Sequence, residues 1–209
     1  MMSKQPKRAL IVIDVQNEYV TGNLRIEYPP IEQSMANIGR AMDAATAAGI
    51  PVIVIQHLLP ESAPIFATGS HNAELHPLVG ERPRDHFIQK QMASSFAGTD
   101  LAAYLKQHDI DTLSVIGYMT HNCDDSTVRQ AHHEGWNVEL LHDAAGSPPY
   151  SNAMGSATAE EIHRVFTVVM HTGFAAVLST DDWLKALETG EVPQPDNIYL
   201  SNQRALQAR

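Results

Sequence analysis

The sequence contains a single cysteine, Cys123, in 209 residues, so no disulfide can form within the chain. This composition is typical of proteins in reducing compartments, and we expect a cytoplasmic protein. Basic residues are scarce too: 14 Lys and Arg stand against 24 Asp and Glu, a formal charge of −10. A negative charge of this size repels phosphate backbones, so no nucleic-acid partner is expected.

Long hydrophobic runs are also absent. No apolar run approaches the roughly 20 residues that span a bilayer, and the basic start of the chain lacks the pattern of a signal peptide. We therefore expect no membrane association. Hydrophobic residues make up 44% and charged residues 18%, which indicates a globular protein. We predict one domain over residues 1–209, with the polar tail from about residue 190 either flexible or at a subunit interface.

Runs rich in Val, Ile and Leu alternate with segments of helical periodicity. The first two runs lack the polar alternation of half-exposed strands, which is typical of parallel strands covered on both faces. Strands followed by helices imply right-handed crossovers and a three-layer α/β/α fold around a mostly parallel sheet. The predicted strands are residues 9–13, 51–55, 87–88, 113–116, 138–141 and 175–178, and the predicted helices are 31–48, 100–108 with Thr99 as cap, 123–135, one opening with a capping box at 158–161, and one after Thr180.

Three residues with reactive side chains follow predicted strands: Asp14, Lys90 and Cys123. Ligands of parallel sheets bind at this carboxyl edge. Taken singly, each residue has a structural explanation, as a turn former, a solvated charge or a small buried side chain. Together they supply a proton acceptor, a cation and a nucleophile at one edge of the sheet.

The context of Cys123 favours a catalytic role. The segment 117–123 leaves a buried strand and enters a predicted helix, whose unpaired amides and dipole favour a thiolate. A nearby lysine would lower the pKa of the thiol further. A carboxylate could accept the thiol proton and pass it to a leaving amine, while backbone amides hold an oxyanion.

Three separated motifs resemble the isochorismatase-like cysteine hydrolases, a superfamily that includes nicotinamidases and N-carbamoylsarcosine amidase. They are LIVIDVQN at 10–17, IQKQMASSF at 88–96 and GYMTHNC at 117–123 followed by STVR at 126–129, within a similarity over about 8–187. The resemblance implies that Cys123 is the nucleophile, that Asp14 accepts and donates protons, and that Lys90 stabilises the thiolate.

The resemblance also implies further features of the fold and site. The family sheet has six parallel strands in the order 3-2-1-4-5-6, and family members are commonly dimers or tetramers. A cis peptide is expected between Tyr118 and Met119, with the amides of Met119 and Cys123 forming an oxyanion hole. Four residues are predicted to contact a small-molecule substrate: Asn17, His71, Thr120 and His121.

The resemblance does not by itself imply a metal. Nicotinamidases of this superfamily carry an Asp and His residues for a metal after the second strand. Here that stretch contains His57 without an Asp two residues before it, and His71 and His76 follow. Histidines without the carboxylate form a poor ligand set, so we expect no metal and no other cofactor.

The leading hypothesis is hydrolysis of a small amide-type C–N bond through a thioester. An isochorismate-type enol-ether hydrolase is the alternative within the family, but that chemistry does not need a cysteine nucleophile. A thiol redox protein would need a resolving cysteine, which the chain lacks. A non-catalytic binding protein on the same scaffold would not need the combination of Asp14, Lys90 and Cys123.

Overall fold

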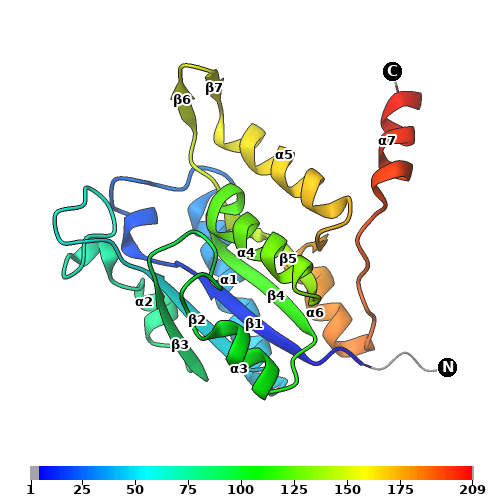
Figure 1. The fold of residues 1–209 in the computed structure, drawn as a ribbon, viewed down its shortest axis with the longest axis horizontal. Coiled ribbons are helices and arrows are strands. Elements are labelled where there is room, and N and C mark those ends of the chain that lie inside the picture. Colours follow the sequence, from blue (N-terminus) through cyan, green and yellow to red (C-terminus); the bar gives the residue numbers. More distant parts are fainter. Residues whose placement is uncertain (1–4, 209) are drawn as a thin grey trace.

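A six-stranded sheet, parallel at every pairing, forms the centre of the protein (Figure 1). The computed structural model describes residues 5–208. The strands are β1 (Arg8–Ile13), β2 (Val52–His57), β3 (His86–Lys90), β4 (Thr112–Tyr118), β5 (Asn137–Gly146), β6 (Tyr150–Asn152), β7 (Gly155–Ala157) and β8 (Ala176–Leu178). The order β3-β2-β1-β4-β5-β8 confirms the predicted topology, with β8 as the sixth strand. The strands β6 and β7 form a separate antiparallel hairpin that was not predicted.

Helices cover both faces of the sheet, as predicted. They are α1 (Ile31–Ala47), α2 (Pro77–Gly80), α3 (Leu101–Gln107), α4 (Asp125–His133), α5 (Ala159–His171), α6 (Thr180–Thr189) and α7 (Ile198–Gln207), with the short 3₁₀-helices η1 (Asn17–Tyr19) and η2 (His71–Ala73) and the π-helical segment η3 (Thr120–Asp124). One core cluster joins the sheet to α3, α4 and α5. The other joins it to α1, α2 and α6. None of the helices in residues 5–208 has the length and apolar character to cross a membrane.

The central strands are buried on both sides, which explains their unbroken apolar sequences. Every residue of β1 and β4 is buried. Because side chains alternate along a strand, Ile11 and Ile13 of β1 enter one core cluster while Leu10 and Val12 enter the other. The carboxyl ends of β1 and β4 are thereby fixed side by side.

The predicted helices agree with the structure except at three places. The regular α-helix expected to start at Cys123 starts at Asp125, because the π-helical segment η3 comes first. The N-cap position of α3 is Asp100 and not the predicted Thr99, although Thr99 Oγ1 accepts a hydrogen bond from Leu101 N over 3.3 Å. The tail, for which flexibility was one expectation, contains the helix α7, capped by the Asn197 side chain. Both hydrogen bonds of the capping box between Thr158 and Glu161 are present, as predicted.

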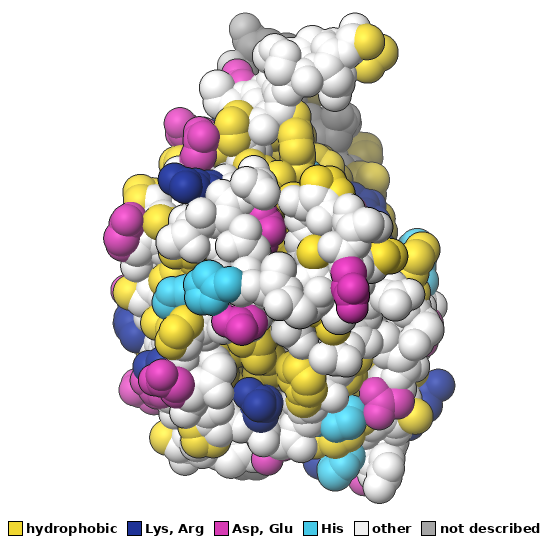
Figure 2. All heavy atoms as spheres, turned by 90° about the vertical axis from the view of Figure 1, so that its left-hand side faces the viewer, with side chains coloured by type: hydrophobic (Ala, Val, Ile, Leu, Met, Phe, Trp, Pro, Cys, Tyr) yellow, Lys and Arg dark blue, Asp and Glu magenta, His cyan; other side chains and the backbone are white. Residues whose placement is uncertain are grey.

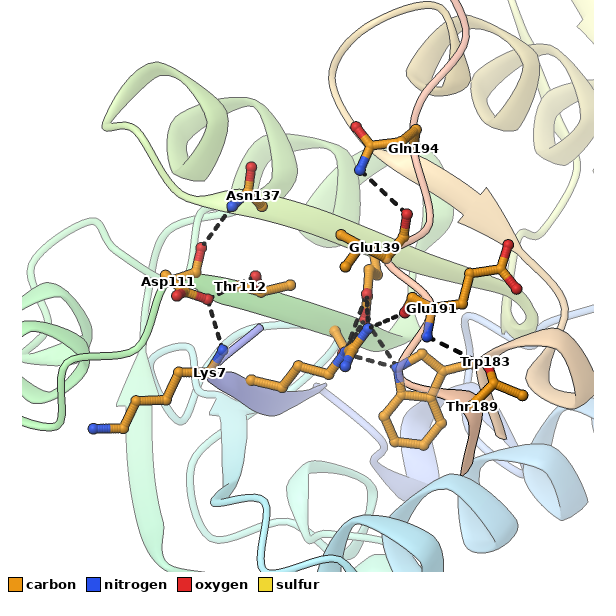
Figure 3. Close-up of polar contacts among 12 residues, drawn as sticks. Lys7, Asp111, Thr112, Asn137, Glu139, Trp183, Thr189, Glu191 and Gln194 are labelled. Carbon is orange, nitrogen blue, oxygen red and sulfur yellow. Dashed lines mark hydrogen bonds and ion pairs between the residues drawn. The ribbon is translucent and has the colours of Figure 1, made fainter. Parts of the chain in front are cut away.

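A buried ion pair ties the sheet to α6 and to the start of the tail (Figure 3). Arg8 Nη2 lies 2.7 Å from Glu139 Oε1, and the two side chains are 6% and 3% exposed. Glu139 Oε2 also accepts hydrogen bonds from Ser114 Oγ and Trp183 Nε1 at 2.7 and 3.0 Å. The Arg8 guanidinium additionally donates to the Glu191 carbonyl oxygen over 3.4 Å. These hydrogen bonds offset part of the cost of burying two charges.

Glu139→Gln is expected to lower the free energy of unfolding by about 3–5 kcal/mol, because it leaves the Arg8 guanidinium buried without a counter-charge. Urea unfolding followed by circular dichroism measures the change. The matched control is Asp109→Asn in the exposed Lys7–Asp109 pair, whose side chains are 51% and 87% exposed. That variant should not change stability measurably. Equal effects of the two substitutions would contradict a structural role for the buried pair.

Candidate active site

The three residues predicted from the sequence meet at the carboxyl edge of the sheet. Asp14 directly follows β1, Lys90 is the last residue of β3, and Cys123 lies in η3 between β4 and α4. Their exposed fractions are 0%, 2% and 4%. The strand β2 lies between β1 and β3, so the lysine side chain reaches toward Asp14 from two strands away, as predicted.

The Lys90 ammonium contacts both of the other side chains. Its Nζ lies 2.7 Å from Asp14 Oδ2 and 3.3 Å from Cys123 Sγ. It also donates to the Met92 carbonyl oxygen over 3.1 Å. A nucleophile, a carboxylate and a cation are therefore in direct contact in a site nearly closed to solvent.

The electrostatics of the site favour a thiol in the resting state. Burial raises the pKa of Cys123 and Asp14 raises it further, while Lys90 opposes both, and the result lies well above the ordinary value. Burial alone would lower the pKa of Lys90, but Asp14 and Cys123 raise it above its ordinary value. The helix start and Lys90, which the sequence indicated as favouring the thiolate, are therefore outweighed, because burial and the neighbouring carboxylate raise the pKa by more than one ammonium group lowers it.

Asp14 is held in an unusual backbone conformation. Its φ is +52°, in the left-handed region, where a residue other than glycine pays about 1–2 kcal/mol. Two hydrogen bonds hold it there: Asp14 N donates to the Ile55 carbonyl oxygen, and Gln16 N donates to the Asp14 carbonyl oxygen, at 3.1 and 2.8 Å. Such strain is often found at functional positions, where the surrounding structure fixes a side chain.

The turn that carries Cys123 depends on a glycine. Gly117 has φ +118°, and a Cβ atom there would lie 2.0 Å from the carbonyl oxygen of Ile13. Only glycine therefore lets β4 approach β1 this closely, one residue before Asp14. One residue further on, the Tyr118–Met119 peptide is cis, as the resemblance implied. Asp124 N then donates to the Met119 carbonyl oxygen over 3.2 Å, which closes the turn around Cys123.

Comparison with known proteins identifies the family. A family model described as the isochorismatase domain matches residues 8–182, which include the whole cluster of Asp14, Lys90 and Cys123. The chain belongs to the isochorismatase family. It is accordingly a hydrolase.

Three similar proteins of the isochorismatase family align with most of this chain. A crystal structure of an isochorismatase-like protein from Burkholderia xenovorans LB400 is 59% identical, covers 99% of each chain and has a TM-score of 0.97. The isochorismatase family protein YddQ of Bacillus subtilis is 30% identical over 85% of this chain and 98% of its own. The ureidoacrylate amidohydrolase RutB of Methylorubrum extorquens is 28% identical over 83% of each chain.

His57 adjoins the cluster, and its place there was not predicted. It ends β2 directly opposite Lys90, and its Nδ1 lies 3.1 Å from Lys90 Nζ. Burial and then Lys90 lower the pKa of His57, which favours the neutral ring as an acceptor for the ammonium. The Gln16 side chain fixes the His57 backbone, donating to its carbonyl oxygen and accepting from its N–H, both at 2.9 Å. The sequence signal that could have predicted this contact is the position of Gln16 and His57 near the ends of two neighbouring strands, β1 and β2.

The four predicted substrate contacts form two separate groups. Asn17 Nδ2 donates to the carbonyl oxygen of His71 over 3.0 Å, and the His71 ring is exposed and pairs with Glu74. Thr120 and His121 lie in η3 beside Cys123. The hydrogen bond from the Asn17 side chain to the His71 backbone holds the first two residues to each other.

Two tyrosines, Tyr19 of η1 and Tyr150 of β6, lie near the segment that carries Cys123. The Tyr150 hydroxyl lies 3.1 Å from His121 Nε2 and 3.5 Å from Met119 Sδ. Tyr19 is buried, and burial, Cys123 and Asp14 raise its pKa well above the ordinary value. Figure 2 views the face at which the strands end, where hydrophobic and histidine side chains reach the surface between acidic groups. Neither tyrosine could be placed from sequence periodicity, because both lie outside the predicted strands and helices.

The residues at the site do not fit a metal. In the described residues, the one grouping of three potential ligands is Asp14, His57 and Cys123, whose ligand atoms lie within 4.8 Å of one another. The Lys90 ammonium contacts all three, at 2.7, 3.1 and 3.3 Å. The ammonium group therefore occupies the place between these three side chains where a metal ion would bind, and it already supplies the positive charge. The histidines after β2 do not converge either, because His71 binds Glu74 and His76 accepts from Leu78 N to cap α2.

Removal of metals is expected to leave activity unchanged. Dialysis against a strong chelator, followed by assay with and without zinc, iron or manganese, measures this directly. The reason is that Lys90 already compensates the charge of Asp14 and contacts Cys123. Activity lost on chelation and restored by one metal would mean that Lys90 leaves its position in the working enzyme.

Proposed function

We propose that this hydrolase cleaves a small amide-type C–N bond through a thioester on Cys123, with Asp14 as acid and base and Lys90 as the charge-stabilising group. The observation that carries the proposal is the contact of one buried ammonium group with both the carboxylate and the thiol. A thiol with a raised pKa needs a base during attack, and Asp14 is the nearest carboxylate.

The proposed reaction has two halves. Cys123 Sγ attacks the carbonyl carbon while its proton passes to Asp14, and the amides of Met119 and Cys123 stabilise the oxyanion. Asp14 then returns the proton to the leaving nitrogen as the C–N bond breaks, which leaves a thioester. In the second half Asp14 takes a proton from water, the hydroxide oxygen attacks the thioester carbon, and the thiol leaves with that proton.

The substrate we propose is a small amide or ureide. Cys123 is 4% exposed, so only a compact group can reach its sulfur. The tyrosines near the turn supply aromatic walls and hydroxyl groups for a planar, uncharged substrate. The similarity to a ureidoacrylate amidohydrolase supports the ureide class. Hydrolysis of an isochorismate-type enol ether is less well supported, because it would leave the Cys123 contacts without a role.

The chemical state of Cys123 also bears on where the protein acts. We propose the reducing cytoplasm, because a thiol nucleophile must remain reduced and the chain has no second cysteine. We also propose that the protein self-associates.

Trapping the acyl-enzyme tests the proposed function. A panel of small primary amides, ureides and isochorismate is screened for product release, and the active compound is then mixed with protein and quenched in acid. Mass spectrometry should find the acyl group on Cys123, and added hydroxylamine should divert it to a hydroxamate. Turnover of isochorismate alone, with no adduct on Cys123, would overturn the proposal. Cys123→Ser provides the matched control for adduct formation.

A further inference from the structure

The helix α7 makes little contact with the rest of its own chain. None of its residues is buried. Its apolar side chains are largely exposed: Ile198 72%, Tyr199 66%, Leu200 52% and Leu206 51%. A helix of ten residues is marginal in water by itself, since isolated helices shorter than ~12–15 residues rarely persist. Because its own chain buries none of its residues, α7 would be stabilised by packing against another surface.

A second apolar surface lies on α5. Val165, Val168 and Val169 are 48%, 57% and 41% exposed. Their spacing of three and four residues places them on one side of the helix, away from the buried Met170 and Ala159. Exposed single hydrophobic residues are ordinary, but three adjacent β-branched residues on one helix face indicate a contact surface.

The two surfaces lie close in the fold. Asp196 N, just before α7, donates to the carbonyl oxygen of His171, the last residue of α5, over 2.8 Å. Figure 1 shows α7 standing apart from the sheet and its covering helices, beyond the end of α5. We call residues 191–208 the arm. The arm lies outside the 8–182 that the family model matches, yet the Burkholderia relative aligns over 99% of this chain.

We propose that the arm and the exposed valines of α5 form an interface with a second copy of this chain, each copy laying its α7 against the α5 of the other. In a two-fold symmetric dimer, the α7 of each copy contacts the α5 of the other, so the same contact forms twice. This arrangement covers both surfaces at once, whereas an unrelated partner would have to match each of them separately.

The exposed apolar area is sufficient for such a dimer. Full burial of one such side chain removes roughly 60–120 Å² from water, and the seven side chains on α5 and α7 are 41–72% exposed. They then contribute about 350 Å² of apolar area per copy, or ~700 Å² in a symmetric pair. Because apolar atoms make up only ~60% of an interface, this corresponds to about 1,100 Å² in total, which reaches the ~1,000 Å² expected of a specific interface. Polar neighbours at the rim supply the remaining area.

A membrane surface is a poorer occupant. Helices that lie on anionic membranes carry Lys and Arg along their polar face. The only basic residue of α7 is Arg204, which already pairs with Asp196. The net charge of −10 would also repel an anionic lipid surface.

Light scattering coupled to size-exclusion chromatography of the full-length protein tests the proposal. The wild type should be a dimer or a higher even-numbered assembly at micromolar concentration. Tyr199→Glu and Val168→Glu should each shift it toward smaller species. Met154→Glu is the matched control, because Met154 is 95% exposed at the tip of the β6–β7 hairpin and lies outside both surfaces. Circular dichroism verifies that each variant remains folded.

Cysteine trapping identifies which surfaces meet. In the Cys123→Ser background the chain has no other thiol, so Tyr199→Cys is mixed with Val165→Cys, Val168→Cys or Val169→Cys on separate chains. Oxidation should give covalent heterodimers for at least one pair, and none with Met154→Cys. A wild type that stays monomeric at 100-fold higher concentration, or a dimer unaffected by both glutamate variants, would overturn the proposal.

Discussion

Cys123→Ala is expected to lower kcat by roughly 10⁴-fold or more, the usual consequence of removing a covalent nucleophile from its catalytic unit. The reason is that Cys123 supplies the one thiol among the described polar contacts of Lys90. Steady-state assay on the substrate found by screening measures the loss. Stoichiometric iodoacetamide labelling of the wild type should follow the loss of activity.

The same substitution also affects stability, because Cys123 is 4% exposed and belongs to a core cluster. Removal of its sulfur should therefore cost about 1 kcal/mol of unfolding free energy. Cys123→Ser keeps most of the volume and separates the two effects. Near-normal turnover by a folded Cys123→Ser or Cys123→Ala protein would disprove the covalent mechanism.

Asp14→Asn and Lys90→Met are each expected to lower kcat/KM by at least about 10²-fold, because a positioned acid/base or a fixed charge contributes that much. The double variant should be little worse than the poorer single variant, since members of one catalytic unit are not additive. Additive losses would instead indicate two independent substrate contacts.

Stability should respond to these substitutions in a different pattern from activity. Both side chains of the Asp14–Lys90 ion pair have 0% exposed area. Either single substitution leaves one charge buried without a partner and should cost about 3–5 kcal/mol, whereas the double variant removes both charges and should recover much of that loss. Urea unfolding of the three variants measures this cycle. A double variant less stable than both single variants would contradict a paired role.

The thiol of the Lys90→Met protein should also react more slowly with alkylating agents near neutral pH. Lys90 is the group that opposes the effect of burial and of Asp14 on the pKa of Cys123. Its removal raises that pKa further and reduces the thiolate fraction. The rate of iodoacetamide labelling against pH separates this electrostatic effect from a general loss of structure.

The sequence by itself determined the sheet and the three reactive residues. Unbroken apolar runs such as 9–13 specify parallel strands buried on both faces, and the topology then places the residues that follow β1, β3 and β4 at one edge. Local signals were also sufficient at Thr158 and Glu161, where the capping box needs only two side chains three residues apart. Such features depend on short-range chemistry.

Tertiary structure alone decided the direction in which the pKa of the thiol shifts, and which side chains contact the three reactive residues. The pKa of a thiol beside a lysine also depends on its burial and on nearby carboxylates. At Cys123, burial and Asp14 raise the pKa by more than Lys90 lowers it. The contact of His57 with Lys90 depends on the register of β2 and β3, which the spacing in sequence does not reveal. Position is what fixes these properties, because desolvation and Coulomb interactions act through space rather than along the chain.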